Sequence, residues 1–94
     1  FSLATLTFEK PDPEVFKGLA FAYEAIRSGG SMTTVFNAAN ERAVAMFLDE
    51  RIGFTQIYDI IGECMAAHKT IAHPDLDEIL ETEQETYRYI ESRW

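Results

Sequence analysis

Residues 32–48 carry the pattern that most constrains the fold, because their apolar side chains recur at the spacing of an α-helix. We expect this helix to start at residue 33 or 34 and to end at residue 48. Alanines at positions 38, 39, 43 and 45 leave room for a neighbouring helix to approach closely. The predicted core face consists of Phe36, Ala39, Ala43, Met46 and Phe47. The pattern therefore indicates a helix at the centre of a small bundle.

A helix is also predicted over residues 13–27. Asp12 can cap its first amides, and Pro13 suits the first helical position because its φ is fixed. Glycines at positions 29 and 30 then favour a left-handed end to the helix. One apolar stripe runs along this helix at the spacing expected of a packing face, and it consists of Phe16, Leu19, Ala20, Tyr23 and Ile26.

A third helix is expected to run through about residue 67, with Thr55 as its cap. Its apolar side consists of Ile57, Ile60, Ile61, Cys64 and Met65. A turn at residues 73–75 is followed by a short helical piece over residues 76–80. Thr82 with Glu85 three residues later matches a capping box, so we expect the last helix to start there. The side chains predicted to face inward from it are Tyr87, Ile90 and Trp94.

The first residues alternate in polarity, with Leu6 and Phe8 on one face and threonines on the other. This pattern predicts an extended arm that lies along the bundle or pairs with a sheet in an upstream domain. The fold class predicted for the chain is therefore all-α, a small four-helix bundle preceded by an extended, strand-like linker arm. We place a linker over residues 1–30, with the arm at 2–9 and a helix at 13–27, and the C-terminal bundle over residues 31–94.

Length and charge exclude several classes of protein. Ninety-four residues suffice for one small domain with one core. A hydrophobic fraction of 47% is too high for a disordered chain, and no apolar run is long enough to cross a bilayer. Sixteen acidic residues against eight Lys and Arg give a net charge of −8, which repels nucleic acid and anionic membrane surfaces. We therefore expect neither nucleic acid nor a membrane among the partners.

The sequence opens at Phe1 without an initiator Met, so we expect the native start to lie elsewhere. Cys64 is the single cysteine, and it cannot form an internal disulfide. This cysteine usage agrees with a reducing, cytosolic setting.

Asn-Ala-Ala-Asn-Glu at 37–41 is an unusual polar insert in the amphipathic run 32–48. Residues 6–12 and 19–30 precede this run, and Ile-Gly-Phe at 52–54 leads from it into the next helix. In this order the segments resemble the C-terminal part of the 1-deoxy-D-xylulose 5-phosphate reductoisomerase family. The resemblance covers most of the chain and places the nucleotide-binding and catalytic domains upstream of it.

The resemblance implies that the intact enzyme rearranges 1-deoxy-D-xylulose 5-phosphate and reduces it to 2-C-methyl-D-erythritol 4-phosphate, in the non-mevalonate route to isoprenoids. It implies NADPH and a divalent metal, magnesium or manganese, as cofactors of that enzyme, and a bacterial cytoplasmic location. The implied partners are the upstream catalytic and nucleotide-binding domains of the same chain, with a homodimer left open. We expect the 94-residue chain alone to hold no cofactor, to be inactive and to have a structural task.

Asn37, Asn40 and Glu41 form the polar cluster that helical spacing singles out, since residues three and four apart are neighbours on a helix. They could bind a ligand, but a site needs convergent groups from other elements, and the sequence offers none. We expect a structural role instead, in which the amides and the carboxylate bond to loop backbone or cap another helix. No residue is predicted to be catalytic or to bind a cofactor or a metal.

Three other motifs lack the context that their chemistry requires. The glycines at 29–30 follow a helix, which favours a helix end over a phosphate loop. His68, His73 and Cys64 are too few for a closed zinc site, and apolar neighbours would raise the pKa of the Cys64 thiol instead of activating it. His-Pro-Asp at 73–75 also occurs in J-domain co-chaperones, but the acidic helix before it has the wrong charge for their partner.

A different class of function remains open from the residues alone. The chain could be a stand-alone helical protein-interaction module whose apolar arm, with Leu3, Leu6 and Phe8, docks on a partner sheet by strand addition. The two interpretations differ in what precedes Phe1. A glycine-rich dinucleotide turn and metal-binding carboxylates upstream would support the reductoisomerase, whereas a start codon directly before Phe1 would support the module.

Overall fold

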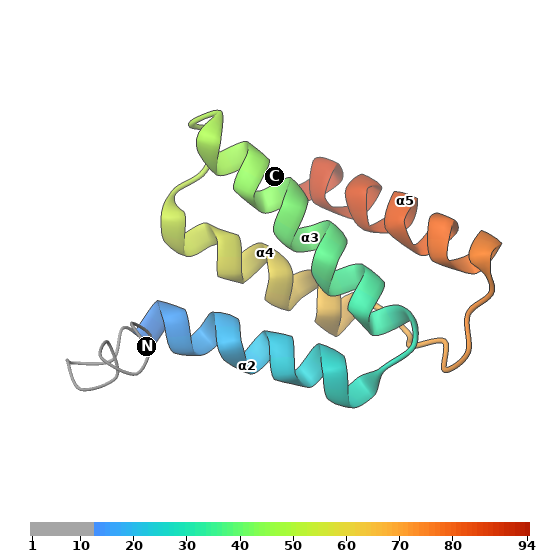
Figure 1. Ribbon diagram of the computed structural model, residues 1–94. Coiled ribbons are helices and arrows are strands. Elements are labelled where there is room, and N and C mark those ends of the chain that lie inside the picture. Colours follow the sequence, from blue (N-terminus) through green and yellow to red (C-terminus); the bar gives the residue numbers. More distant parts are fainter. Residues whose placement is uncertain (1–12) are drawn as a thin grey trace.

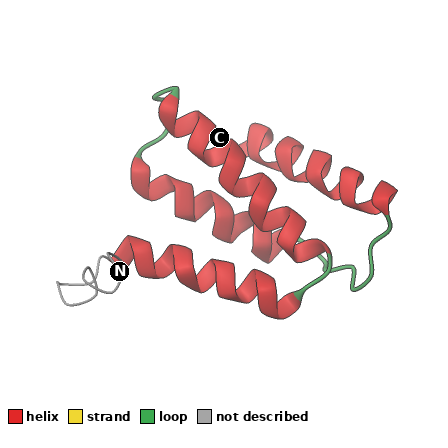
Figure 2. Cartoon of the chain, viewed as in Figure 1, coloured by secondary structure: helices red, strands yellow, loops and turns green. Residues whose placement is uncertain are grey.

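The computed structural model of the chain describes residues 13–94. Four α-helices make up this part, and they are α2 (Pro13–Ser28), α3 (Ser31–Leu48), α4 (Phe54–Ala67) and α5 (Leu76–Arg93). Short loops join them (Figure 2). The all-α four-helix bundle is confirmed, while the predicted arm at residues 2–9 and the cap at Asp12 lie outside the described residues.

Helix α3 is the centre of the bundle, as its alanines predicted. It packs against α4, α5 and α2, and α2 also packs against α4 (Figure 1). The backbones of α2 and α5 do not lie next to each other. The bundle is therefore an α3–α4 pair with α2 and α5 attached at separate places.

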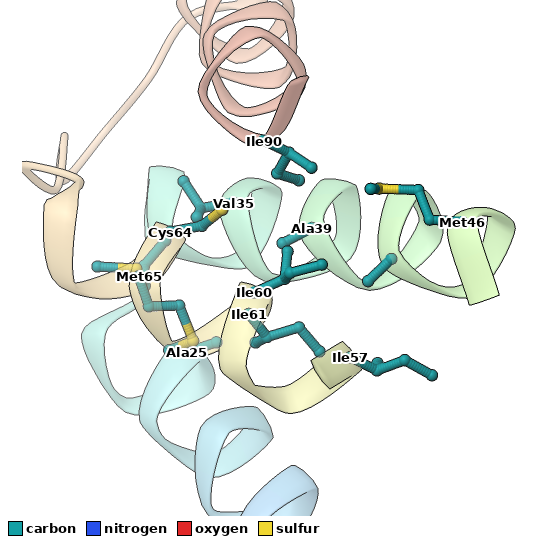
Figure 3. Close-up of a cluster of buried hydrophobic side chains, with 12 residues drawn as sticks. Ala25, Val35, Ala39, Met46, Ile57, Ile60, Ile61, Cys64, Met65 and Ile90 are labelled. Atoms are coloured by element: carbon teal, nitrogen blue, oxygen red, sulfur yellow. The ribbon is translucent and has the colours of Figure 1, made fainter. Parts of the chain in front are cut away.

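The core draws on all four helices (Figure 3). The five apolar residues predicted for α4 are all buried, and so are Ala39, Ala43 and Met46 of α3. Phe36 and Phe47 are half-buried and pack against this cluster. The buried apolar cluster consists of Ala25, Met32, Val35, Ala39, Ala43, Met46, Ile57, Ile60, Ile61, Cys64, Met65 and Ile90.

Helix α2 packs with a different face from the one predicted. Phe16, Leu19, Tyr23 and Ile26 are exposed, and Ala25 is the α2 residue in the core. Glycines explain the difference, because a Cβ on Gly18 would lie 2.6 Å from the Tyr58 ring of α4, and one on Gly62 of α4 would lie 2.8 Å from Phe21. Each of these rings packs directly over a glycine of the other helix, which lets α2 and α4 approach closely. Helix α2 therefore buries Ala25 and exposes its larger apolar stripe.

Two helix starts differ from the prediction by one to three residues. Helix α3 begins at Ser31, directly after Gly30, and not at residue 33 or 34. Helix α4 begins at Phe54, so its capping residue is Gly53 and not Thr55. Gly53 N donates to Gln56 Oε1 at 2.7 Å, so the side chain of Gln56 reaches back and satisfies the backbone amide of the capping residue.

The prediction that the last helix starts at Thr82 is wrong. Helix α5 is continuous from Leu76, and Asp75 caps it: Asp75 Oδ1 accepts from Glu78 N at 2.8 Å, and Asp75 N donates to Glu78 Oε1 at 3.1 Å. This capping box comes first in the chain, and no helix breaker separates it from Thr82. Thr82 is instead buried in the helix interior, where its carbonyl accepts from Thr86 Oγ1 at 2.8 Å.

The side chains predicted to face inward from α5 differ in burial. Ile90 is fully buried, whereas Tyr87 and Trp94 are half-buried. The buried Thr82 and Thr86 complete the inner face. The division of the chain into a linker over residues 1–30 and a bundle over residues 31–94 stays a prediction, although the helix assigned to that linker is one of the four packed helices.

Candidate functional site

A buried polar junction forms where the turn between α2 and α3 meets the segment between α4 and α5. Ser31, the first residue of α3, has an exposed fraction of 0%. Its Oγ lies 2.7 Å from His68 Nε2 and accepts a hydrogen bond of 2.7 Å from Ile71 N. Its backbone N donates to Ile71 O at 2.9 Å. Ser31, His68 and Ile71 are called the junction below.

The hydrogen bond between Ser31 and His68 fits either direction. Ser31 Oγ accepts from Ile71 N and still has one proton to donate and one lone pair to accept with, so His68 Nε2 can be the acceptor or the donor. Burial lowers the pKa of His68 below its ordinary value of 6.5, and the negative charge of Glu85 opposes this shift. Burial therefore favours the neutral ring.

Gly30 allows the backbones to meet at this point. Its φ of 53° is in the left-handed region, and a Cβ there would lie 2.0 Å from Ile71 O. Gly29 also has a positive φ, of 66°, but a Cβ on it would meet nothing within 4 Å. The glycine pair ends α2 as predicted, and Gly30 additionally makes room for the segment after α4.

The Ser31–His68 pair has the residue types of a nucleophile and a base, but its surroundings suit a structural contact. A nucleophile must reach its substrate, and Ser31 is fully buried. Its Oγ also accepts an amide hydrogen bond from Ile71, which withdraws electron density from the attacking atom. The junction therefore joins two loops. Local spacing did not predict it, because Ser31 is 37 positions from His68 and 40 positions from Ile71.

The other residues considered for chemistry have separate roles. Cys64 is buried, and burial together with the charge of Glu63 raises the pKa of its thiol to about 11, so the thiol is unreactive at neutral pH. His73 is exposed. Asp75 is used as the cap of α5, so the His-Pro-Asp tripeptide serves as a helix start.

Asn37, Asn40 and Glu41 are exposed on α3. The expected bonds from their side chains to loop backbone or to another helix end have no counterpart among the hydrogen bonds of residues 13–94. Their neighbour Arg42 turns toward α5, where it lies 3.2 Å from Glu91 Oε1 and 4.8 Å from the centre of the Tyr87 ring. A structural role for the cluster stays a prediction.

An open groove of about 760 Å³ lies between α2, α4 and the end of α5. Its charged groups pair across the helices, with Lys17 Nζ 2.9 Å from Asp59 Oδ1 and Arg93 Nη2 2.9 Å from Glu63 Oε1. Trp94 Nε1 is buried there and has no hydrogen-bond partner among the residues that the structure describes. These pairings join the helices and leave little unmatched charge for a ligand.

Comparison with known proteins identifies the family. The family described as the DXP reductoisomerase C-terminal domain matches residues 1–89. The chain belongs to this family. A 1-deoxy-D-xylulose 5-phosphate reductoisomerase of Agathobacter rectalis is 55% identical over 94 residues, which is 100% of this chain and 25% of that protein. Enzymes of the same name from Thermoanaerobacter sp. and Bacillus cereus are 50% identical over 95 and 90 residues, at 25% and 24% of their lengths. No solved structure matches the chain.

The family assignment confirms the resemblance of the ordered segments around residues 37–41, and it does not favour the stand-alone interaction module. As a reductoisomerase C-terminal domain, the chain spans about a quarter of the length of the curated relatives it matches. The other three quarters of those enzymes therefore have no counterpart in residues 1–94.

The described part of this reductoisomerase domain does not fit the cofactors that the family implies. Residues 13–94 bring together no group of three or more His, Cys, Asp or Glu that could hold a metal ion. Their glycine pair follows a helix, whereas a dinucleotide-binding turn leaves a strand and opens a helix. No described helix is long and apolar enough to cross a membrane.

Proposed function

We propose that this chain is the structural C-terminal domain of a longer enzyme that converts 1-deoxy-D-xylulose 5-phosphate to 2-C-methyl-D-erythritol 4-phosphate with NADPH and a divalent metal, magnesium or manganese. The family match over residues 1–89 carries the proposal. The short coverage of the relatives supports it, because an enzyme four times as long has room for the domains that bind nucleotide, metal and substrate.

The proposal assigns no catalytic, cofactor-binding or metal-binding residue to the chain. The task of the chain is to form a rigid helical bundle that is attached to the catalytic part of the same polypeptide. The buried core and the polar junction of Ser31, His68 and Ile71 support such a task, since both fix the helices relative to one another. The exposed Asn37, Asn40 and Glu41 are then structural residues whose partners belong to upstream domains.

The proposed partners are those upstream domains, with a homodimer as the further assembly to test, and the proposed location is the bacterial cytoplasm. The bacterial relatives support the location, and their greater length supports the upstream domains. The stand-alone module is the weaker alternative, because the family match implies a longer polypeptide.

The experiment compares the full-length protein, expressed from the complete gene, with the 94-residue chain. With 1-deoxy-D-xylulose 5-phosphate and Mg²⁺ or Mn²⁺, the full-length protein should oxidise NADPH, and a metal chelator should abolish the reaction. The 94-residue chain should neither oxidise nor bind NADPH at the same concentration. A full-length protein without this activity would overturn the enzymatic assignment, and saturable NADPH binding by the 94-residue chain would overturn the structural one.

A further inference from the structure

Helix α2 exposes a continuous apolar stripe, which consists of Phe16, Leu19, Tyr23 and Ile26. These residues repeat at three, four and three positions, so they form one line along a helical face about 15 Å long. Tyr23 and Ile26 are 71% and 70% exposed. Single exposed apolar residues are common on proteins, but a row of four on one helix marks an interaction surface.

The stripe cannot be covered by the bundle itself. Helix α2 already packs through its opposite side, with Gly18 against Tyr58 and Phe21 against Gly62. Rotating α2 to bury the stripe would pull Ala25 out of the core and separate the rings from the glycines. The exposed apolar face is therefore a fixed property of this packing.

The charged residues beside the stripe are paired within the domain. Lys17 Nζ donates to Asp59 Oδ1, and Arg27 Nη2 donates to Glu24 Oε2. Neither pair presents an uncompensated charge that would attract a charged partner. The surface therefore suits an apolar partner better than a charged one.

The position of α2 in the chain identifies the occupant. This is a C-terminal domain that spans a quarter of its relatives, so the polypeptide outside it joins the chain ahead of α2. Helix α2 is the first described helix, so the upstream polypeptide joins the chain on the N-terminal side of α2. A second copy is a poorer occupant, since each 94-residue chain has a net charge of −8 and two copies repel each other.

We infer that the stripe of Phe16, Leu19, Tyr23 and Ile26 is the surface on which the upstream domains of the same polypeptide dock. This inference rests on the proposed function, because it requires a longer chain. It adds the surface through which the attachment is made, and it makes α2 the element that joins the bundle to the catalytic part.

The test measures how fast a thiol reagent modifies a cysteine placed in the stripe. Tyr23→Cys is made in the full-length protein and in the 94-residue chain, and Leu76→Cys on α5 is the matched control because Leu76 is 69% exposed. Trypsin releases position 23 between Lys17 and Arg27 and position 76 between Lys69 and Arg88, so mass spectrometry reads each site apart from upstream cysteines. The buried Cys64 lies in a third peptide and reports unfolding.

Position 23 should react at least tenfold more slowly in the full-length protein than in the 94-residue chain, whereas position 76 should react at similar rates in both. Equal rates at position 23 would overturn the inference. Slow reaction at position 23 in the 94-residue chain that speeds up on dilution would also overturn it, because a second copy would then cover the stripe. If Cys64 reacts in the Tyr23→Cys variant, that variant is unfolded. Ile26→Cys is then measured in its place, because Ile26 is 70% exposed on the same stripe.

The outcome is independent of the enzymatic assignment. NADPH oxidation by the unmodified full-length protein tests the activity, and the labelling rate tests the docking surface. A full-length protein that is inactive with 1-deoxy-D-xylulose 5-phosphate but protects position 23 would refute the proposed activity and support the docking surface.

Discussion

A serine hydroxyl can donate one hydrogen bond and accept two, so a single side chain can bind two partners. Ser31 Oγ accepts from Ile71 N and shares a second hydrogen bond with His68 Nε2, so one fully buried side chain joins two loops. The sequence predicted the helix end at residues 29–30 and singled out His68, but it did not show that these two segments meet in the fold. Contacts between residues 37 positions apart depend on how the helices pack, which local spacing does not encode.

Ser31→Ala should destabilise the domain by about 1–3 kcal/mol, because the amide of Ile71 loses a buried acceptor and His68 Nε2 loses its partner. Chemical denaturation of the 94-residue chain measures this change. Ser28→Ala is the matched control, since Ser28 is exposed at the end of α2 and should change the free energy of unfolding by less than about 0.5 kcal/mol. Equal effects of the two substitutions would contradict the role of the junction.

The stability of the domain should fall as the pH is lowered below about 6.5. The folded state has a lowered pKa at His68, so the unfolded chain takes up this proton first and is favoured in acid. The stabilisation is fully present above the unfolded pKa and is lost as the pH falls toward the folded one. Melting temperatures between pH 8 and 5 measure it. His68→Gln should flatten this dependence, because it removes a group whose pKa differs between the folded and unfolded states.

Asn37→Ala and Asn40→Ala should each change the free energy of unfolding of the 94-residue chain by less than about 0.5 kcal/mol, because both side chains are exposed. This expectation replaces the larger effect that partly buried amides would produce. In the full-length enzyme the same substitutions should lower the melting temperature and leave the turnover number nearly intact. A large loss of turnover at an unchanged melting temperature would instead assign these residues to the reaction.

At the scale of single helices, periodicity predicted the number of packed helices and most of the buried residues, and its errors have local causes. Every residue predicted for the inner face of α4 is buried, because the apolar residues of this helix define a single packing face. Helix α2 offered two faces, one with large apolar residues and one with Gly18, Phe21 and Ala25. The second face is buried because glycine lets an aromatic ring approach closely, and hydrophobic spacing gives no weight to glycine.

Gly30→Ala should destabilise the domain much more than Gly29→Ala. Both positions have positive φ, which costs alanine about 1–2 kcal/mol. Only at Gly30 would the new methyl group meet a backbone oxygen, Ile71 O, which would have to move and break the contact between the loops. Denaturant unfolding of the two variants gives the comparison, and a Gly29→Ala effect as large as that of Gly30→Ala would contradict it.

At the scale of the whole molecule, the family and the architecture could be inferred from the sequence, whereas the surfaces could not. The ordered segments around residues 37–41 resemble one family, and this likeness is confirmed along nearly the entire chain. Which side chains remain exposed depends on the rotation of each helix in the bundle. The exposed stripe on α2 and the exposed Asn37 and Asn40 therefore became visible only in the structure.

The 94-residue chain alone should fold and should lose its helical far-ultraviolet signal in one cooperative transition. The reason is that a single buried cluster includes residues from all four helices, so no helix has a core of its own. Circular dichroism and tryptophan fluorescence should give the same midpoint, since Trp94 packs against that cluster. Two separated transitions would contradict a single cooperative unit.

The order of contacts along the chain has a consequence for folding during synthesis. The junction closes between Ser31 and residues 68–71, so the contacts that bind α2, α3 and α4 involve nothing beyond residue 72. Helix α5 follows in the chain and packs mainly against α3 and also against α4. Once α2, α3 and α4 have left the ribosome, the junction can therefore form before α5 has emerged. If upstream domains dock on the stripe of α2 as proposed, they could bind it at this stage.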